Sequence, residues 1–579
     1  MNSHRTAIRQ HAFNTTVDLP DTSRLNDSAM RAAIQDRART LVRHLREDSK
    51  PGLMELMLAE YGLSTEEGVA LMCLAEALLR VPDPETMDDL IEDKIAPSKW
   101  GLHLGKSSSP LINSSTWALM ITGRILDPKT PIHKTLGGMM KRLGEPVIRR
   151  AVREAMKIMG RQFVLGETIG GALKRSSGKY RYSYDMLGEA AMTTPDALEY
   201  YGDYETAIRA LAARCNSKDV ADNPGISVKL SALHPRYDEF QRDRVMAELV
   251  PRVKDLAKLA ADAGMGFNID AEESERLELN LDVVEALARD PDLAGWDGLG
   301  LVVQAFGPRS PAVIDWVAAL AKDTDRRLMV RLVKGAYWDT EIKRAQVMGL
   351  ERYPVYETKS DTDRSYILCA EKLLAYRPVL YPQFATHNAH TVASVLELAG
   401  DDQSGYEFQR LHGMGDALHA YLREKLDRPV RIYAPVGEHE DLLAYLVRRL
   451  LENGANSSFV SKVTDKDVSI DEVIADPFDD DRKTMLPRPK DTTEPHKNSA
   501  GYDLRDKLTA DAVLTARDVF RDTVWTYGDG VPVINPARPK EVVGGVNFAT
   551  KAETEAAIDR AEPWSADAAT RASVLLKAA

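Results

Sequence analysis

Polar and ionisable side chains stand at the ends of several short apolar runs in the second half of the chain. Seven of these runs carry or end in such residues: Lys229; Asp270; Gln304; Arg331; Thr386, His387 and Asn388; Gln409; and Tyr433. A polar group within an apolar strand is costly unless it finds a partner, so any one of them fits a buried hydrogen-bonded network. The repetition of this ending in seven runs indicates a shared ligand.

The residue types predict the shape of this ligand. Arg331, Gln304 and residues 386–388 provide many hydrogen-bond donors. The segment Gly335-Ala336-Tyr337-Trp338 lets the backbone approach closely and adds flat aromatic surface. This combination suits a planar ring rich in heteroatoms with a phosphate-bearing tail, such as a flavin. No Walker A motif is present, and no G-x-G-x-x-G segment lies at a strand-to-helix turn, so a Rossmann-type site is not supported.

Two adjacent arginines, Arg448 and Arg449, lie on a predicted helix that follows the last apolar run and also carries Glu452. Neighbouring helix positions point about 100° apart, so the simplest interpretation is a solvated helix face. If the helix folds over the mouth of the strand assembly, both guanidinium groups could instead hold a carboxylate. Lys229 would then add a third positive charge, and Asp270 would balance the cluster.

Other chemistries have less support in the sequence. Lys229 or Lys334, each at a strand end, could form a Schiff base as in barrel aldolases. His387 and His390 lack a neighbouring acidic residue at a metal-binding spacing, so we expect no metal site. No Ser-His-Asp or Cys-His arrangement has a local signature.

Eight apolar runs alternate with amphipathic stretches of helical periodicity after about residue 180. This alternation predicts parallel strands joined by helices. Eight strands satisfy one closed (β/α)₈ barrel of the TIM type, whose usual size is about 250 residues, and an open doubly wound sheet is the competing fold. The runs are residues 182–187, 226–230, 266–270, 299–306, 328–333, 380–386, 406–411 and 430–434.

The rest of the chain divides into segments that differ in composition and periodicity. We expect an N-terminal helical arm over residues 1–60, an α-helical domain over 61–180 and the barrel over 181–470. The helical domain begins with a capping box, Ser64 and Glu67, before an apolar helix over Gly68–Arg80. Residues 471–520 are rich in Pro and charge, which is typical of a linker, and residues 521–579 are too few for a complete domain.

The composition argues against several classes of protein. Hydrophobic residues make up 44% of the 579, enough for a large core, and no apolar run suggests a membrane span. The net charge of −12 disfavours sequence-independent DNA binding, so we expect no nucleic-acid partner and keep a nucleic-acid-binding regulator only as an alternative hypothesis. A polar N-terminus without a signal core, and three widely separated cysteines, indicate a cytoplasmic protein with reduced thiols.

Seven motifs resemble the bacterial proline utilisation A family over roughly residues 60–470. They are GVALMCLAEALLR (68–80), SYDMLGEAAMT (183–193), SVKLSALHPRY (227–237), FNIDAEE (267–273), RLVKGAYWD (331–339), ATHNAH (385–390) and LVRRLLENGANSSFV (446–460). Members of the family join a flavin-dependent proline dehydrogenase barrel to an NAD-dependent glutamate semialdehyde dehydrogenase.

The ends of the chain refine what the resemblance implies. Residues 521–579 resemble the beginning of an aldehyde dehydrogenase domain and stop before a catalytic Cys or an NAD-binding motif, so we expect the second activity to be absent. Some family members carry an N-terminal ribbon-helix-helix DNA-binding domain, which the first 50 residues do not resemble.

The resemblance implies a role for each candidate residue. The proline carboxylate would be held by Lys229, Arg448 and Arg449, and the proline ring would pack against Tyr337 and Tyr433. Asp270 would organise the site beside Lys229, and Arg331 would lie near the flavin N5 atom, which makes these three the expected catalytic residues. FAD would be bound by Asp270, Val302, Gln304, Arg331, Val333, Gly335, Ala336, Trp338, Thr358, Lys359, Ser360, Thr386, His387, Asn388, Gln409, Glu452, Ser458 and Phe459.

The reaction that the resemblance implies is the FAD-dependent oxidation of L-proline to pyrroline-5-carboxylate. It is the first step of proline catabolism to glutamate, with hydride transfer from proline C5 to flavin N5. Family members pass the electrons to a membrane quinone, so the resemblance also implies peripheral contact of a cytoplasmic protein with the inner face of the membrane. A homo-oligomer is compatible with the same resemblance.

Overall fold

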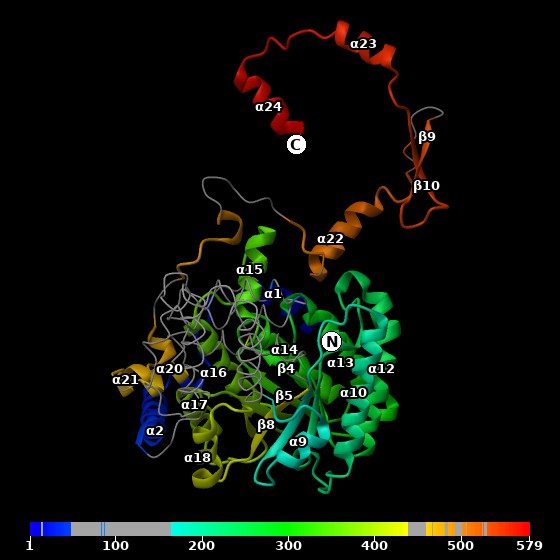
Figure 1. Ribbon diagram of the computed structural model, residues 1–579. Coiled ribbons are helices and arrows are strands. Elements are labelled where there is room, and N and C mark those ends of the chain that lie inside the picture. The colour runs from blue at the N-terminus through cyan, green and yellow to red at the C-terminus, as the bar shows by residue number, and fades with distance from the viewer. Residues whose placement is uncertain are drawn as a thin grey trace, which may run out of the picture. The chain divides into compact units, whose positions relative to one another are not determined.

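The computed structural model describes residues 1–12, 16–47, 83, 86, 164–437, 448, 459–465, 467–480, 484–492, 501–504, 506–523, 525 and 530–578. Within them, eight parallel strands close into a barrel in chain order (Figure 1). The closed (β/α)₈ barrel is therefore confirmed, and the open sheet is wrong. The strands are β1 (Arg181–Met186), β2 (Gly225–Val228), β3 (Gly266–Ile269), β4 (Leu299–Gln304), β5 (Leu328–Val333), β6 (Leu380–Ala385), β7 (Glu407–Leu411) and β8 (Val430–Val436).

Each strand alternates between an apolar outer face and a largely polar inner face. On β5, Leu328, Val330 and Leu332 are fully buried in the core shared with the surrounding helices. Arg331, between them, donates hydrogen bonds to the hydroxyls of Ser183 on β1 and Ser227 on β2, at 3.1 and 3.0 Å. A side-chain period of two thus sends every second residue into the barrel, where polar groups must find partners in one another.

The inner face is packed closely as well as paired. The amide of Asn268 on β3 donates to Gln383 Oε1 on β6 at 2.7 Å. Gly300 on β4 leaves room for this amide, because a Cβ atom there would lie 1.9 Å from Asn268 Oδ1. Paired polar side chains therefore fill this layer of the barrel interior.

Helices connect the strands and form the outer layer. Two residues that the sequence placed at the cofactor are also helix N-caps: the Thr358 hydroxyl accepts from Asp361 N at 3.1 Å, and the Asn388 carbonyl oxygen Oδ1 accepts from Thr391 N at 3.0 Å. These bonds satisfy amides that the first helical turn leaves unpaired. The connecting helices are α10 (Thr194–Ala212), α11 (Leu230–Leu233), α12 (Arg242–Asp262), α13 (Leu277–Ala288), α14 (Ser310–Asp323), α15 (Trp338–Met348), α16 (Lys359–Ala375), α17 (Ala389–Ala399) and α18 (Asp416–Leu426).

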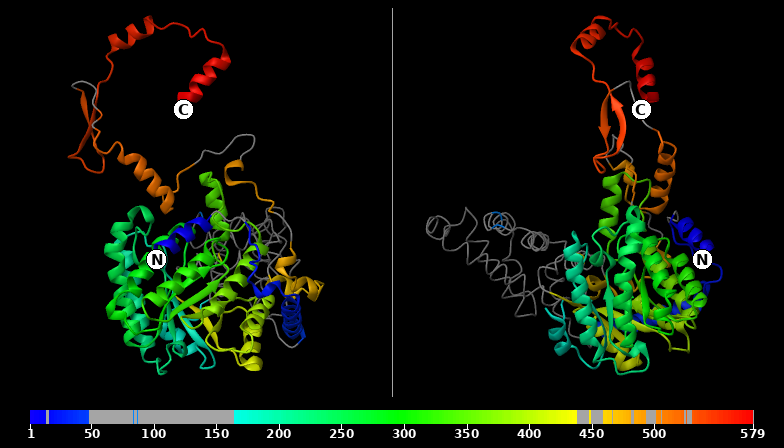
Figure 2. Two further views of the ribbon diagram at one scale, coloured as in Figure 1. Left: turned by 180° about the vertical axis from the view of Figure 1, so that it is seen from behind. Right: turned by 90° about the vertical axis from the view of Figure 1, so that its right-hand side faces the viewer.

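The N-terminal arm packs on the outside of this helical layer, where its blue helices lie in Figure 2. Helix α1 (Asn2–His11) contacts α14, and α2 (Ser28–Glu47) runs along α17. Helix α2 also contacts α20 (Phe459–Thr464) and α21 (Ile470–Val473), which follow the barrel in the chain. The arm thus joins two segments that lie far apart in the sequence.

Part of the expected linker packs against the barrel. Arg364 Nε donates to the carbonyl of Pro477 at 2.7 Å, and the Tyr353 hydroxyl donates to the carbonyl of Pro487 at 2.9 Å. Proline-rich composition indicated a linker because it lacks periodicity. Its carbonyls can nevertheless accept hydrogen bonds from barrel side chains, and here they do.

Residues 511–579 form a second compact unit. Its described part contains the antiparallel strands β9 (Val531–Ile534) and β10 (Val542–Val546), followed by α23 (Lys551–Asp559) and α24 (Ala568–Ala578); α22 (Lys507–Asp518) precedes them. Many of its large apolar side chains are exposed, such as Phe548 and Leu576. Its identity as the beginning of an aldehyde dehydrogenase domain stays a prediction.

The expected helical domain over residues 61–180 lies mostly outside the described residues, and so do its capping box and the helix over Gly68–Arg80. Its described part includes α9 (Ile169–Arg175), which precedes β1. No helix among the described residues is long and apolar enough to cross a membrane.

The ion pair near the amino-terminal ends of the strands gives a test of the fold. Arg431 Nε lies 2.6 Å from Glu407 Oε1, and both side chains are almost fully buried. We expect Arg431→Met to lower the free energy of unfolding by about 3–5 kcal/mol, because it leaves a buried carboxylate with less compensation. Urea unfolding followed by circular dichroism measures this change. Arg209→Met is the control, since Arg209 is exposed and its loss should cost under about 1 kcal/mol.

Candidate active site

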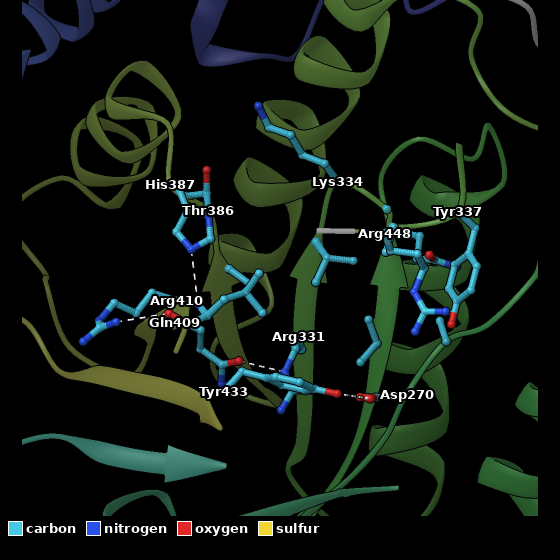
Figure 3. A pocket seen from close by; sticks show the side chains of 18 of the residues that line it. Asp270, Arg331, Lys334, Tyr337, Thr386, His387, Gln409, Arg410, Tyr433 and Arg448 are labelled. Atoms are coloured by element: carbon cyan, nitrogen blue, oxygen red, sulfur yellow. Dashed lines mark hydrogen bonds and ion pairs between the residues drawn. The ribbon is translucent and has the colours of Figure 1, made fainter. Parts of the chain in front are cut away.

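The polar strand ends converge on one cavity of about 250 Å³ at the mouth of the barrel (Figure 3). Lys334 and Arg410 also line it. Most of the residues that the sequence placed at the site lie there together: Lys229, Asp270, Val302, Gln304, Arg331, Val333, Gly335, Ala336, Tyr337, Lys359, Thr386, His387, Asn388, Gln409, Tyr433, Arg448 and Phe459.

Arg331 is the most enclosed cation of the cavity, with 3% of its side chain exposed. Its Nη1 atom donates to Asp270 Oδ1 at 2.9 Å, and its Nε atom donates to Gln409 Oε1 at 2.7 Å. Its guanidinium carbon also lies 5.1 Å from the centre of the Tyr433 ring. Together with the hydrogen bonds from Arg331 to Ser183 and Ser227, these contacts fix the guanidinium plane at the cavity floor.

Lys229 forms a second charged cluster beside the first. Its ammonium lies 2.8 Å from Asp185 Oδ2 and 3.6 Å from Asp270 Oδ2. The Tyr433 hydroxyl lies 2.7 Å from Asp185 Oδ2 and 2.8 Å from Asp270 Oδ2, so this phenol bridges the two carboxylates. Because Asp270 also binds Arg331, the two clusters form one network.

The neighbours of Lys229 favour its charged form. Burial opposes the charge on Lys229, but Asp185, Tyr433 and Asp270 outweigh it and raise the pKa of the Lys229 ammonium well above its ordinary value. Burial also raises the pKa of the Asp185 carboxyl. The ammonium donates to both oxygens of the Asp185 carboxyl, a geometry that favours the charged form of the lysine. A lysine held in this state is a poor nucleophile, which argues against a Schiff base on Lys229.

Arg448 lies against the cavity and not on a solvated face. Its two terminal nitrogens donate to the two carboxylate oxygens of Glu189 at 2.7 and 2.8 Å, and its guanidinium carbon lies 5.0 Å from the centre of the Tyr337 ring. Only 14% of its side chain is exposed. The solvated-face interpretation is therefore wrong for Arg448. Arg449, Glu452 and Ser458 lie outside the described residues.

Sequence reasoning missed the two carboxylates that hold these cations. Asp185 and Glu189 both belong to the motif SYDMLGEAAMT, to which we gave no site role. A signal was present, because Asp185 interrupts an apolar strand in the same way as Arg331 does. Glu189 follows the strand end, where nothing local separates a ligand of Arg448 from a surface residue.

The cofactor side of the cavity combines close backbone with cations. Gly335 has a φ of 132°, and a Cβ atom there would lie 2.5 Å from the Phe306 ring, so this position requires glycine. His387 Nε2 accepts from the Leu411 amide at 3.1 Å. Lys334 pairs with Asp363 at the rim. Burial, together with the nearby charge of Lys334, lowers the pKa of Lys359 to about 8. This wall suits an anionic, flat ligand.

Three predicted cofactor residues lie outside this cavity. Thr358 and Ser360 line a neighbouring cavity of about 1070 Å³, and Lys359 lines both. Trp338 Nε1 donates to the carbonyl of Tyr356 at 2.8 Å, in the apolar cluster around Phe306. The structure therefore does not bring these three to the floor where Arg331 lies.

Fold and cavity together define a (β/α)₈ barrel with a charged ligand site at the carboxyl ends of its strands, the position that barrel enzymes use for chemistry. A family model described as proline dehydrogenase matches residues 170–462, a range that includes all eight strands. The chain belongs to the proline dehydrogenase family.

Similar proteins agree with the motif resemblance. The chain is 48% identical over 571 residues to the bifunctional protein PutA of Escherichia coli (strain K12), covering 92% of this chain but 43% of that one. It thus spans less than half the length of this relative. Proline dehydrogenase 1 of Bacillus subtilis (strain 168) is 27% identical over 316 residues, which are 53% of this chain and 90% of that one. A crystal structure of proline utilization A from Bradyrhizobium japonicum matches with a TM-score of 0.68 and 49% identity, over 87% of this chain and 52% of that one.

A second family model, described as the DNA-binding domain of proline dehydrogenase, matches residues 53–163. Apart from residues 83 and 86, this range lies outside the described residues. The match counts against the expectation of no nucleic-acid partner. That expectation rested on the net charge of the whole chain, which does not determine the charge of one region, and on the lack of a ribbon-helix-helix domain in the first 50 residues.

The Arg448–Glu189 pair gives a test of the site that depends on pH. Burial opposes ionisation of Glu189, but the hydrogen bonds and charge of Arg448 outweigh it and lower the pKa of this carboxyl. A lowered pKa stabilises the folded state above the unfolded pKa, and the contribution is lost as pH falls. We expect Glu189→Gln to destabilise the protein by about 1.5–3 kcal/mol at pH 7. The difference from wild type should shrink as pH falls below the ordinary Glu pKa of 4.5, toward about pH 3.

Urea midpoints measured at both pH values check this expectation. Glu205→Gln is the control, because Glu205 makes an exposed i,i+4 pair with Arg209 and should change little at either pH. An equal loss in Glu189→Gln at both pH values would show that the ion pair does not stabilise the fold.

Proposed function

We propose that this chain is an FAD-dependent L-proline dehydrogenase that oxidises L-proline to pyrroline-5-carboxylate. The observation that carries the proposal is the charged cavity, where Arg331, Lys229 and Arg448 meet in a member of the proline dehydrogenase family. Three cations around one cavity suit ligands that carry carboxylate and phosphate groups. The names of similar proteins, bifunctional protein PutA and proline dehydrogenase 1, support the same activity.

The residues around the cavity fit FAD. Arg331 offers a buried cation that favours negative charge in a ring system beside it, and Gly335 lines the same cavity. Lys334 and Lys359 at the rim would attract the phosphates, and Thr386 and His387 would supply polar contacts. When bound, FAD supplies the two-electron oxidation that amino-acid side chains cannot perform.

The substrate end would be set by Arg448, Lys229 and two tyrosines. Arg448 would hold the proline carboxylate, with Lys229 as a second positive charge and Arg449 as a third. Tyr337 and Tyr433 line the same cavity and offer flat surface for the pyrrolidine ring. Because Glu189 already pairs with Arg448, the substrate carboxylate would have to compete with it.

The electron acceptor and the cellular setting are further parts of this proposal. A quinone acceptor and peripheral contact with the inner face of the membrane rest on the likeness to the proline utilisation A family. A homo-oligomer rests on the same likeness. A cytoplasmic location rests on the polar N-terminus and the three separated cysteines.

The visible absorption spectrum of the purified chain tests the function most directly. We expect a yellow protein whose flavin bands bleach when L-proline is added without air. The aldolase alternative predicts instead a colourless protein in which borohydride traps a carbonyl substrate on lysine. An FAD-loaded protein that proline fails to bleach would contradict the proposal.

The carboxylate clamp predicts the behaviour of Arg448→Met. Removing a charge-assisted contact from a desolvated site typically costs about 2–5 kcal/mol, which is roughly 30-fold or more in affinity. We expect the proline concentration needed for half-maximal rate to rise by at least this factor while FAD stays bound. Steady-state kinetics and the FAD content of the purified protein measure both quantities.

A matched control for this clamp is Arg423→Met. Arg423 lies on α18 and does not line the cavity; it pairs with its neighbour Glu424 and lies over the Tyr180 ring at 4.9 Å. Proline amide lacks the carboxylate that Arg448 would hold, so the two variants should differ little in their affinity for it. Normal turnover of proline by Arg448→Met would remove the substrate assignment.

DNA binding is a second candidate function, favoured by the family match over residues 53–163. A gel shift with duplex DNA at physiological salt tests it. A shifted band would support this function, and unshifted DNA would count against it.

A further inference from the structure

Asp185 is a fully buried carboxylate that has no role in the function proposed above. Its side chain, on β1, is 0% exposed. It nevertheless touches two residues that do have roles, since the Lys229 ammonium lies 2.9 and 2.8 Å from its two oxygens and the Tyr433 hydroxyl lies 2.7 Å from one of them. A buried carboxylate with these partners determines where the Lys229 ammonium and the Tyr433 hydroxyl lie.

The contacts fix where the Lys229 ammonium can lie. A lysine head group is a compact charge on a flexible stem and takes whichever acceptors are near. Here the backbone amide of Lys229 is tied to the Tyr204 hydroxyl at 3.1 Å, and the ammonium is held between both oxygens of Asp185. The stem is therefore fixed at both ends, with 7% of the side chain exposed.

The charged and titratable groups that face this ammonium come from five elements. They are Asp185 of β1 with Glu189 after it, Tyr204 of α10, Asp270 after β3, Arg331 of β5 and Tyr433 of β8. Asp270 is farther away, at 3.6 Å, and its other oxygen binds Arg331. Asp185 is thus the carboxylate of this group that lies closest to Lys229 and does not also bind Arg331.

We propose that Asp185 is a positioning residue that keeps the Lys229 ammonium charged and fixed at the cavity floor, where it serves the substrate carboxylate. The inference rests on the proposed function. It assigns Asp185 no contact with proline, because the side chain is fully buried and does not line the cavity.

The proposal predicts a change in how binding depends on pH. In Asp185→Asn the amide keeps the shape of the side chain but no longer balances the charge. Burial would then favour the neutral amine and lower the pKa of Lys229. A neutral Lys229 attracts a carboxylate less, so affinity for a carboxylate ligand should fall as pH rises through the new pKa. Wild type should keep its affinity to higher pH.

The experiment uses the FAD-loaded full chain and a proline analogue that the flavin cannot oxidise, because it lacks the ring nitrogen. Tetrahydrofuran-2-carboxylate has the ring and the carboxylate of proline but no amine. Its dissociation constant is measured by calorimetry and by the flavin absorption change from about pH 6 to about pH 9.5. We expect Asp185→Asn to lose at least about tenfold in affinity across this range, and wild type to lose less than about threefold.

Two further variants separate positioning from mere stability. Glu407→Gln makes the same chemical change in a buried ion pair, with Arg431 at 2.6 Å. The other hydrogen-bond partners of Glu407 are Arg181, Tyr381, Gln383 and Gln409, and not Lys229. This variant should lose stability without gaining the pH dependence. Lys229→Met should bind the ligand weakly at all pH values, and adding Asp185→Asn to it should change the pH profile no further.

Each outcome decides the proposal. An Asp185→Asn profile that follows wild type overturns it, and so does a pH-dependent loss that persists without Lys229. If Asp185→Asn does not fold, Asp185→Glu keeps the charge and should bind more weakly with a flat profile; a new loss of affinity at high pH there overturns the proposal too. Failure of the proposed function is distinct, because it would appear in wild type as flavin that proline does not bleach.

Discussion

A charge inside the barrel persists only when an opposite charge lies beside it, and the interior is arranged around this requirement. Arg331 lies 2.9 Å from Asp270, and Lys229 lies 2.8 Å from Asp185. A further pair lies near the amino-terminal ends of the strands. Each pair joins residues on or just after different strands, so the charges are compensated only once those strands have come together. The apolar outer faces drive that assembly by packing against helices. Hydrophobic packing and site assembly are therefore one event.

The same requirement explains why the cavity is charged yet nearly balanced. Each of the cations Lys229, Arg331 and Arg448 already has a carboxylate partner before any ligand enters. Fixed partners hold the cations in place, so little reorganisation is needed when an anionic ligand arrives. The partners differ in access: Asp185 is fully buried, whereas 26% of the Glu189 side chain is exposed. A ligand carboxylate can thus compete for Arg448 more readily than it can displace Asp185 from Lys229.

The limits of sequence reasoning follow from where the signals lie. Arg331 and the other strand ends were predictable because a polar residue within an apolar run is visible locally. Asp185 and Glu189 were not assigned, because their partners lie 44 and 259 residues away and only the folded chain brings them together. Thr358 shows a different limit. A residue expected at the cofactor is also a helix N-cap, so its type alone could not separate the two roles.

The support of the cavity extends to the N-terminal arm, although no described residue of the arm lines it. Arg46, near the end of α2, donates to the carbonyls of Lys462, Val463, Asp465 and Val468 at 2.8–3.1 Å. Carbonyls at the end of a short helix lack partners within it, and a cation there is favourable. That helix, α20, begins at Phe459, which lines the cavity. Helix α2 also packs along α17, whose N-cap is Asn388. The arm therefore holds from outside two elements whose first residues form the cavity wall.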